Sequence, residues 1–411
     1  MKNSTLRVLA LVWAALMIAV LSSTATLLIT GRASFGQVSA SRWVSQDEFD
    51  VIERYRKLDQ VRQTLVDEYY TDVDEDALVL GAIRGMASSI GDPYTFYYTP
   101  EELRRANENN AGLYHGIGTL LQNTDEGRIE VVRVYPDTPA EAAGLRVGDL
   151  ILAVDGAAVS GVNGRTYNDA VSRIRGEDGT NVVLTVQRDG ARMDIAVTRG
   201  DVTVSYASWQ VLPGDIGYIA ISQFRGDAEK VFNNALEAFR AKGVKGLIVD
   251  VRNNPGGMLD MVVNIADRLL PKGLIVYVKT RDGAREDFYS DDEYYDVPLA
   301  VLVNDMSASA SEILAGAVQA LGRGTVVGQT TYGKGIVQSL HVFAEDESCI
   351  QLTTSSYYDA ADRCPQTVGV TPDVVVAPTG AANLDVPDVE NDAQLAAAVE
   401  EVENMINGRS Q

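Results

Sequence analysis

The sequence predicts an α/β fold with a largely parallel sheet, and two features of its second half carry this prediction. The strand-like segments there are continuously apolar instead of alternating with polar residues, and they cover residues 217–221, 246–251, 299–303 and 325–328. Helix-like segments lie between several of them, at residues 228–242, 259–270 and 309–321. Apolar strands joined by helices are typical of a parallel sheet that helices cover on both faces.

The first half of the chain is organised differently. Apolar residues at helical spacing predict one helix over residues 46–70 and another over 75–90, which the turn residues 91–93 end. Short strands and turns then alternate from about residue 112 to 199, which predicts a compact domain of its own. Residues 381–411 form an acidic loop followed by an amphipathic helix.

Composition limits the classes of function. The chain has 411 residues of which 46% are hydrophobic, enough to bury a sizeable core in more than one domain. Its net charge of −22 offers no basic patch to offset phosphate repulsion, which argues against nucleic acid as a partner. The cysteines have no metal-ligand spacing and no His-Glu-x-x-His motif occurs. We therefore expect no metal and no other cofactor.

The N-terminus carries a candidate membrane segment. After Lys2 and Arg7 an uncharged apolar run extends to Ile29, which is long enough to cross a bilayer at about 1.5 Å per residue. Its basic flank predicts an amino end inside the cell and the rest of the chain outside, as in a single-pass membrane protein. A cleaved signal sequence is the alternative, because small residues at 23–25 follow a shorter apolar core; the protein would then be secreted.

Ser309 and Lys334 form the candidate reactive pair. Ser309 follows the apolar strand at 299–303 and begins a helical segment, where free N–H groups favour a developing negative charge. The chain has only two histidines, His115 and His341, which leaves little for a Ser-His-Asp triad. A serine nucleophile with a lysine base is therefore the economical interpretation, and it indicates a serine hydrolase.

Both residues also have ordinary explanations. Ser309 and Glu312 have the spacing of a capping box, in which the serine only closes the helix. Lys334 lies between Gly333 and Gly335, and an exposed loop lysine is the common case. To act as a base its amine must be neutral, and an ordinary lysine pKa of about 10.4 falls far enough only through burial or a nearby positive charge.

Several independent motifs occur in an order that resembles one protein family. They cover residues 81–86, 92–94, 144–149, 250–257, 307–312 and 333–338. Together they resemble the carboxyl-terminal processing proteases of family S41, which are tail-specific serine endopeptidases with a PDZ domain inserted in the protease core. The resemblance runs from about residue 50 to the end. It implies an α/β protease core of the ClpP/crotonase type, preceded by an N-terminal helical segment.

With this resemblance the predicted domains can be named. They are an N-terminal transmembrane anchor or signal sequence at 1–31, a linker at 32–45, an N-terminal helical region at 46–111, a PDZ domain at 112–199, a serine protease core at 200–380, and a C-terminal acidic loop and helix at 381–411. The helical region and the acidic tail could also supply the contacts of a homodimer.

The resemblance assigns roles at the reactive pair. It implies that Ser309 is the nucleophile, that Lys334 is the base, and that Gln338 orients the lysine. Four residues span about 13 Å in an extended strand, so the role of Gln338 requires a coil or kink around Gly335. A glutamine that merely belongs to a strand or to the core is the alternative.

The glycine-rich segment 253–257 follows an apolar strand and could stabilise an oxyanion. A backbone N–H from this segment, paired with the N–H of Ala310, would bind the negative oxygen of a tetrahedral intermediate. By analogy with the family Gly257 is the preferred donor and Gly256 the second choice. Locally, a simple Pro-Gly turn explains the same residues.

The predicted PDZ domain contains a candidate peptide-binding loop. Gly116, Ile117, Gly118, Thr119 and Leu120 resemble the loop whose N–H groups hold a terminal carboxylate, with the next strand pairing to the peptide. The implied partners are proteins or peptides with apolar C-termini. Outside a PDZ context such a Gly-x-Gly is an ordinary turn.

Cys349 and Cys364 are 15 residues apart and flank a strand-like run and a turn. In an oxidising compartment they could form a disulfide; two unpaired thiols are the equal alternative. Neither cysteine is a mark of the family.

The function that follows is an extracytoplasmic serine endopeptidase that binds protein tails through its PDZ domain and cleaves near them. The alternative from another class is a PDZ scaffold with a catalytically silent core. An acyl-CoA enzyme of the crotonase type would leave the PDZ domain unexplained.

Overall fold

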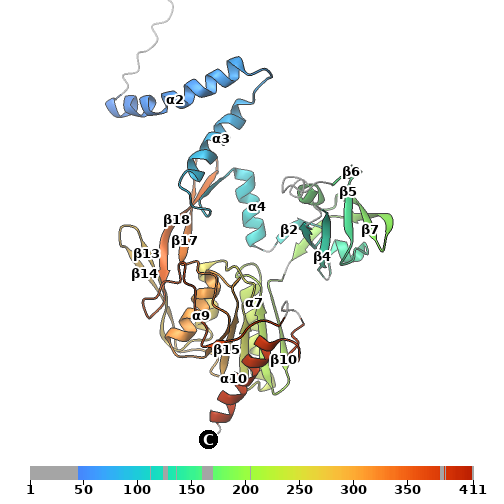
Figure 1. Cartoon of the computed structure of the whole chain (residues 1–411), viewed down its shortest axis with the longest axis vertical. Coiled ribbons are helices and arrows are strands. Elements are labelled where there is room, and N and C mark those ends of the chain that lie inside the picture. The colour runs from blue at the N-terminus through green and yellow to red at the C-terminus, as the bar shows by residue number, and fades with distance from the viewer. Residues whose placement is uncertain are drawn as a thin grey trace, which may run out of the picture. The chain divides into compact units, whose positions relative to one another are not determined.

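The computed structural model describes residues 45–111, 113–123, 128–135, 137–159, 170–203, 205–379, 384 and 386–409 (Figure 1). The chain divides into two compact units, Met1–Ala82 and Ile83–Gln411. The expected anchor at 1–31 and nearly all of the expected linker lie outside the described residues. In the part that the structure describes, no helix is both long and apolar enough to span a membrane.

The first unit contains α2, Gln46–Glu68, and the beginning of α3, Glu75–Ser88. Both helices occur where the apolar spacing predicts them. None of the described side chains of α2 is buried, and large apolar ones such as Ile52 and Tyr55 are exposed. The helix therefore presents an uncovered apolar surface within its own unit.

The core of the second unit is a six-stranded sheet in the order β10, β11, β12, β15, β16, β19. The strands are Ala207–Leu212, Ile216–Ile221, Gly246–Asp250, Leu299–Val303, Thr325–Gly328 and Val374–Val375. Only the β10–β11 pair is antiparallel. The prediction of a largely parallel sheet is confirmed.

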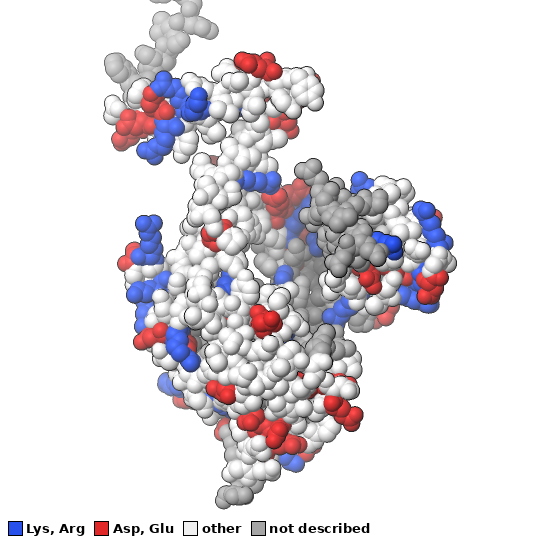
Figure 2. Space-filling model, viewed as in Figure 1, with Lys and Arg blue, Asp and Glu red and all other residues white. Residues whose placement is uncertain are grey.

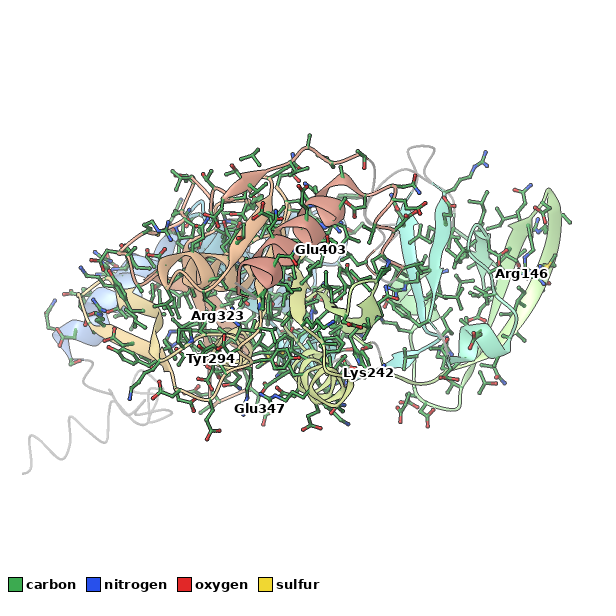
Figure 3. All side chains as sticks on the ribbon, turned by 90° about the horizontal axis from the view of Figure 1, so that it is seen from below. Arg146, Lys242, Tyr294, Arg323, Glu347 and Glu403 are labelled. Atoms are coloured by element: carbon green, nitrogen blue, oxygen red, sulfur yellow. The ribbon has the colours of Figure 1, made fainter. Side chains whose placement is uncertain are left out.

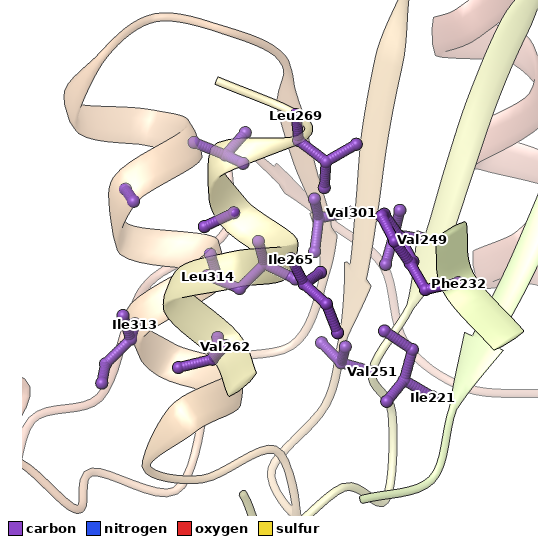
Figure 4. Packing of buried hydrophobic residues seen from close by; sticks show 14 of the residues in the cluster. Ile221, Phe232, Val249, Val251, Val262, Ile265, Leu269, Val301, Ile313 and Leu314 are labelled. Carbon is purple, nitrogen blue, oxygen red and sulfur yellow. The ribbon is translucent and has the colours of Figure 1, made fainter. Parts of the chain in front are cut away.

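Helices cover both faces of this sheet because successive strand residues point to opposite sides. Val249 and Val301 pack on one side against α7 (Ala228–Lys242), α8 (Leu259–Asp267) and α9 (Ala310–Ala320). Figure 4 shows this packing. On the other side Ile248, Ala300 and Leu302 pack against α10, Ala393–Arg409. The acidic C-terminal segment therefore contributes a core helix.

A second sheet of the core is antiparallel and centres on β18, Cys349–Tyr358. It also contains β1 (Phe96–Tyr98), β13 (Gly273–Thr280), β14 (Arg285–Ser290) and β17 (Ile336–Val342). β18 pairs with β1, β13 and β17. The short helix α4, Pro100–Asn110, follows β1.

The strand-rich block between these parts has its own hydrophobic core. Its sheet contains β3 (Thr119–Asn123), β4 (Ile129–Val134), β5 (Leu150–Val154), β6 (Ala157–Ala158), β7 (Asn181–Arg188) and β8 (Ala191–Thr198), and α5 spans Pro139–Ala142. The strands β2 (Leu113–Gly116) and β9 (Gly200–Thr203) pair where the block leaves and rejoins the rest of the chain.

Arg323 joins several core segments beyond the end of α9. Its guanidinium donates to the main-chain carbonyls of Leu269, Tyr295 and Val297 and lies over the ring of Tyr294 (Figure 3).

Figure 2 shows acidic and basic side chains interspersed over the described part of one face, without a broad basic surface.

Of the two alternatives for the cysteines, the structure has the unpaired thiols: Cys349 and Cys364 are both free. Cys349 begins β18, whereas the Cys364 sulfur lies 3.7 Å from the carbonyl of Gly335, near the other end of that strand. A strand rises about 3.3 Å per residue. The length of β18 therefore separates two thiols whose Cα atoms would need to lie within about 7 Å for a bond.

Candidate active site

A cleft of about 390 Å³ lies in the second unit and brings together five predicted site residues. They are Gly256, Gly257, Ser309, Ala310 and Gln338. The segment that follows β12 supplies the two glycines. The start of α9 supplies Ser309 and Ala310, and β17 supplies Gln338. We call it the Ser309 cleft. Lys334 is not among its lining residues.

The structure distinguishes three serines that the sequence presents in one run. Ser307 is fully buried, and its hydroxyl donates to the Val251 carbonyl at 2.7 Å. Ser311 is also buried and donates to the Asn254 carbonyl at 2.9 Å. Both hydroxyls anchor the loop to the segment after β12. Ser309 alone lines the cleft, so it is the serine available to a bound molecule.

The backbone of Ser309 adopts a conformation that side chains disfavour, with φ 56° and ψ −112°. Such a conformation costs about 1–3 kcal/mol and persists where neighbouring bonds over-determine it. Here the Ser309 N–H donates to Glu312 at 2.8 Å, and its carbonyl lies 3.1 Å from the Tyr357 hydroxyl. The strained turn therefore presents the Ser309 side chain to the cleft at the start of α9.

The capping box that Ser309 and Glu312 predict is present at the start of α9. The Glu312 carboxylate accepts the Ser309 N–H, and the Ser309 side chain faces the Glu312 N–H. The Glu312 N–H is also bonded to the main-chain carbonyl of Ser309 at 2.9 Å. Ser309 therefore closes the helix and lines the cleft as well.

Glu312 joins the serine and lysine segments. The side chain is 1% exposed, and its Oε2 accepts both the Ser309 N–H and the Lys334 N–H at 2.8 Å. Its Oε1 accepts the Thr331 hydroxyl at 2.6 Å and the Gly333 N–H at 2.8 Å. Four donors can compensate the cost of burying one carboxylate. Glu312 Oε2 thus holds the segments that carry Ser309 and Lys334 next to each other.

Tyr357 adds a second link that sequence reasoning missed. Its hydroxyl lies 3.1 Å from the Ser309 carbonyl and 2.8 Å from the Lys334 carbonyl. Burial raises the pKa of this phenol well above its usual value, so the hydroxyl stays neutral as a donor. Nothing in the local sequence separates this tyrosine from other strand tyrosines.

The side chain of Lys334 points to a different neighbour. Its amine lies 4.0 Å from the ring centre of Tyr94, and within the described residues it forms no hydrogen bond with the Ser309 hydroxyl. Burial lowers the pKa of the amine, and the charges of Asp92 and Glu312 partly oppose that shift. Lys334 is half-buried, as a basic role requires, but in this conformation its amine faces the Tyr94 ring and makes no hydrogen bond to the serine.

Gln338 lines the cleft but contacts another residue than Lys334. Its side-chain amide donates to the Thr353 hydroxyl at 3.1 Å. β17 has a register shift between Val337 and Gln338, so the strand is kinked close to where the predicted role requires it. The orienting role of Gln338 stays a prediction.

At the cleft, the N–H groups of Gly257 and Ala310 have no acceptor among the described residues. The Gly256 N–H, by contrast, is bonded to the Asn254 side-chain oxygen at 2.8 Å. Gly256 has φ 106°, and a Cβ there would lie 2.8 Å from the Cβ of Ser309. Glycine is therefore required at 256 for close approach, whereas Gly257 has the free donor.

A buried ion network supports the segment before these glycines. Arg252 is 1% exposed and pairs with Asp250 at 2.6 Å and with Asp392 at 2.8 Å. Burial alone would lower the pKa of Arg252, but the two carboxylates outweigh it and raise the pKa. Sequence reasoning missed Asp392, since 140 residues separate it from Arg252.

In the strand-rich block, the predicted carboxylate-binding loop leads into β3. Gly116, Ile117 and Gly118 are buried, and a Cβ at Gly118 would lie 2.3 Å from the Cβ of Thr138. β3 begins at Thr119, pairs with β4 and stands at the end of the strand order in the described sheet. Leu120, the last residue of the loop, is exposed. Strand-adding peptides bind beside such a glycine loop at the edge of a sheet.

Comparison with known proteins supports this architecture. Residues 215–376 match the model of peptidase family S41, residues 130–188 match the PDZ domain, and residues 22–102 match the activating protease CtpB N-terminal domain.

Curated relatives match most of the chain. The carboxy-terminal processing protease CtpA of Bacillus subtilis is 34% identical over 372 residues, which are 90% of this chain and 77% of that protein. A probable CtpA-like serine protease of Staphylococcus saprophyticus is 32% identical over 88% of this chain and 73% of its own length.

Among solved structures, the photosystem II D1 C-terminal processing protease is 28% identical, with a TM-score of 0.51 over 85% of this chain and 96% of that one. The resemblance that the motifs carry is confirmed. The chain belongs to the S41 family of carboxy-terminal processing serine proteases and contains a PDZ domain.

Proposed function

We propose that this protein is an extracytoplasmic endopeptidase that uses Ser309 and Lys334 to cleave proteins near their carboxyl tails, which its PDZ domain binds. One observation carries the catalytic part of the proposal: a single buried oxygen of Glu312 holds the N–H groups of both Ser309 and Lys334. The two segments are thereby set next to each other, as a nucleophile and its base must be.

In the proposed reaction Ser309 Oγ attacks the scissile carbonyl carbon while the neutral Lys334 amine takes the hydroxyl proton. The peptide C–N bond breaks, the lysine gives its proton to the leaving amine, and water then hydrolyses the acyl-enzyme. The free N–H groups of Gly257 and Ala310 would stabilise the oxyanion, each by roughly 2.7–4 kcal/mol. Before attack the lysine side chain must rotate from Tyr94 towards Ser309.

Substitutions test the proposed dyad. Ser309→Ala and Lys334→Ala should each lower kcat/KM for a peptide substrate by more than about 10³-fold. His115→Gln and His341→Gln should leave it nearly unchanged, since neither histidine has a role in this mechanism. Loss of activity in the histidine variants, with activity kept in Lys334→Ala, would reject the dyad.

Tail binding by the PDZ domain rests on the loop at 116–120 and on β3, which stands at the end of the strand order in the described sheet. A peptide with a free carboxylate should bind the full-length Ser309→Ala variant more tightly than the same peptide with an amidated end. Isothermal calorimetry measures the difference. Equal affinities would remove the carboxylate from the proposal.

The location and the oligomeric state belong to the same proposal. The apolar run before Ile29 supports a membrane anchor with the protease outside, and membrane fractionation with protease-accessibility assays tests this.

The exposed apolar side chains of α2 support a homodimer, which sedimentation of the protein with and without Ile52→Lys tests.

A silent peptide-binding scaffold is the second candidate, because the Lys334 amine contacts Tyr94 and forms no hydrogen bond with Ser309. A fluorophosphonate probe separates the two functions. Labelling of Ser309 that is lost in Lys334→Ala supports the enzyme, and absence of labelling supports the scaffold.

A further inference from the structure

The Lys334 amine occupies a defined place formed by the segment between α3 and β1. Its nitrogen lies 4.0 Å from the ring centre of Tyr94, where an ammonium is attracted by the ring face. Asp92, two residues before, is close enough for its charge to act on the amine. We call this place the resting position of Lys334.

Hydrogen bonds attach the resting position to β18. The Asp92 carboxylate accepts the Tyr94 N–H at 3.0 Å and the Thr95 hydroxyl at 2.6 Å. The Gln351 side chain donates to the Tyr94 carbonyl at 3.1 Å, and the Thr353 N–H donates to the Thr95 hydroxyl oxygen at 3.3 Å. The segment is thus held from both sides of the turn.

The same contacts reach the cleft. The Thr353 hydroxyl accepts from the Gln338 amide at 3.1 Å, and the Thr353 N–H donates to Thr95, whose hydroxyl donates to Asp92. Gln338, which the family resemblance connects with the lysine, is therefore joined to Asp92 through two threonines. This route gives Gln338 an indirect link to Lys334 in the present conformation.

The charges around the amine favour its protonated form. Burial raises the pKa of Asp92, but the nearby Thr353 side chain, the Thr95 hydroxyl and the Tyr94 N–H outweigh it and lower the pKa, so Asp92 is ionised wherever the lysine titrates. Glu312 supplies the second negative charge that acts on Lys334.

The two tyrosine hydroxyls near the Lys334 amine add no charge to its surroundings. Burial, and then the neighbouring Tyr332 side chain, raise the pKa of Tyr94. Burial also raises the pKa of Tyr357, whose hydroxyl faces the Lys334 carbonyl. Both phenols stay neutral while the lysine titrates.

We propose that Asp92 and Tyr94 are positioning residues for Lys334: they hold the ammonium away from Ser309 and set the pH above which the amine is released as a base. The inference rests on the proposed function of the dyad. An ammonium is attracted by a ring face and a carboxylate, whereas a neutral amine is attracted far less. The proton loss that makes the amine a base therefore also frees it to rotate towards Ser309.

Asp92→Asn tests the charge and keeps the shape of the side chain. Without the carboxylate the ammonium is less favoured, so the midpoint of the rise of kcat/KM with pH should fall by about one pH unit. Asp346→Asn, in the turn between β17 and β18, is the matched control and should leave the midpoint in place. A midpoint that stays, or that rises, in Asp92→Asn overturns the inference.

Two substitutions test the ring. Tyr94→Phe keeps the ring face and should keep the wild-type midpoint, whereas Tyr94→Leu removes the face and should lower the midpoint and raise activity below it. Equal profiles for the two variants would show that the ring does not hold the amine.

A direct readout separates this inference from the proposed function. Competitive acetylation of Lys334 by acetic anhydride, followed by mass spectrometry across pH, measures the neutral fraction in a Ser309→Ala background where catalysis plays no part. The labelling midpoint should fall in Asp92→Asn. If it does not, while Lys334→Ala is inactive, only the inference fails; if Lys334→Ala retains activity, the dyad itself fails.

Discussion

The two halves of the candidate active site are fixed to different degrees. On the serine side the main chain is held at its N–H and carbonyl, and the glycine loop packs within contact distance of Ser309. On the lysine side the main chain is equally fixed, but the long side chain rests on Tyr94. In the proposed dyad the nucleophile is thus preorganised by the backbone, whereas the base would need one side-chain rotation.

Removing Glu312 should have the largest effect, because it acts on both halves. Glu312→Ala leaves four donors without an acceptor and should lower kcat/KM by roughly 10³-fold or more as both groups lose position. Glu286→Ala, an exposed residue of β14, is the control. Because the variant could unfold, its melting temperature and the milder Glu312→Gln are measured together. A folded, fully active Glu312→Ala would contradict the shared role.

Gly256→Ala should affect the serine side alone. Its Cβ would lie 2.8 Å from both the Ser309 Cβ and the Ala308 carbonyl oxygen, and a displacement near 1 Å costs about 10²-fold in rate. Gly283→Ala has a similar backbone strain, φ 89°, with no atom within 4 Å of the new Cβ. Fluorophosphonate labelling rates compare the two. Equal losses would mean that strain, and not contact with Ser309, causes the effect.

The pH dependence reports on the lysine side alone. Burial lowers the pKa of Lys334, and the amine must be neutral to accept the serine proton. Below that pKa the neutral fraction grows tenfold per pH unit, so log kcat/KM should rise with a slope near one and level off above the pKa. Steady-state rates between pH 6 and 10 test this, and a flat profile would exclude a titrating lysine base.

The smallest expected effect concerns the support beneath the glycine loop. Asp392→Ala removes a charged partner of the buried Arg252 and should lower the free energy of unfolding by about 1.5–3 kcal/mol. Arg252 keeps Asp250, which limits the loss. Lys245→Ala breaks an exposed ion pair and should change stability by less than about 1 kcal/mol. Denaturant unfolding measures both; equal losses would deny Asp392 a structural role.

Much of the fold could be predicted because it depends on local pattern. The helix at 228–242 and the strands at 299–303 and 325–328 have the predicted bounds, since periodicity and turn residues are read within one segment. The free cysteines show that spacing along the chain does not predict distance in the fold. Their spacing along the chain is 15 residues, but an extended ten-residue strand lies between them.

The sequence by itself determined the order of elements, the family, and the serine and lysine as candidates, because motif residues and hydrophobic periods are properties of short segments. Only the tertiary structure decided what surrounds the lysine. Tyr94 and Lys334 are 240 residues apart, and they meet because β1 and β17 pair with the same strand, β18. Contacts of this kind depend on which strands pair and in which register, and no single segment specifies that.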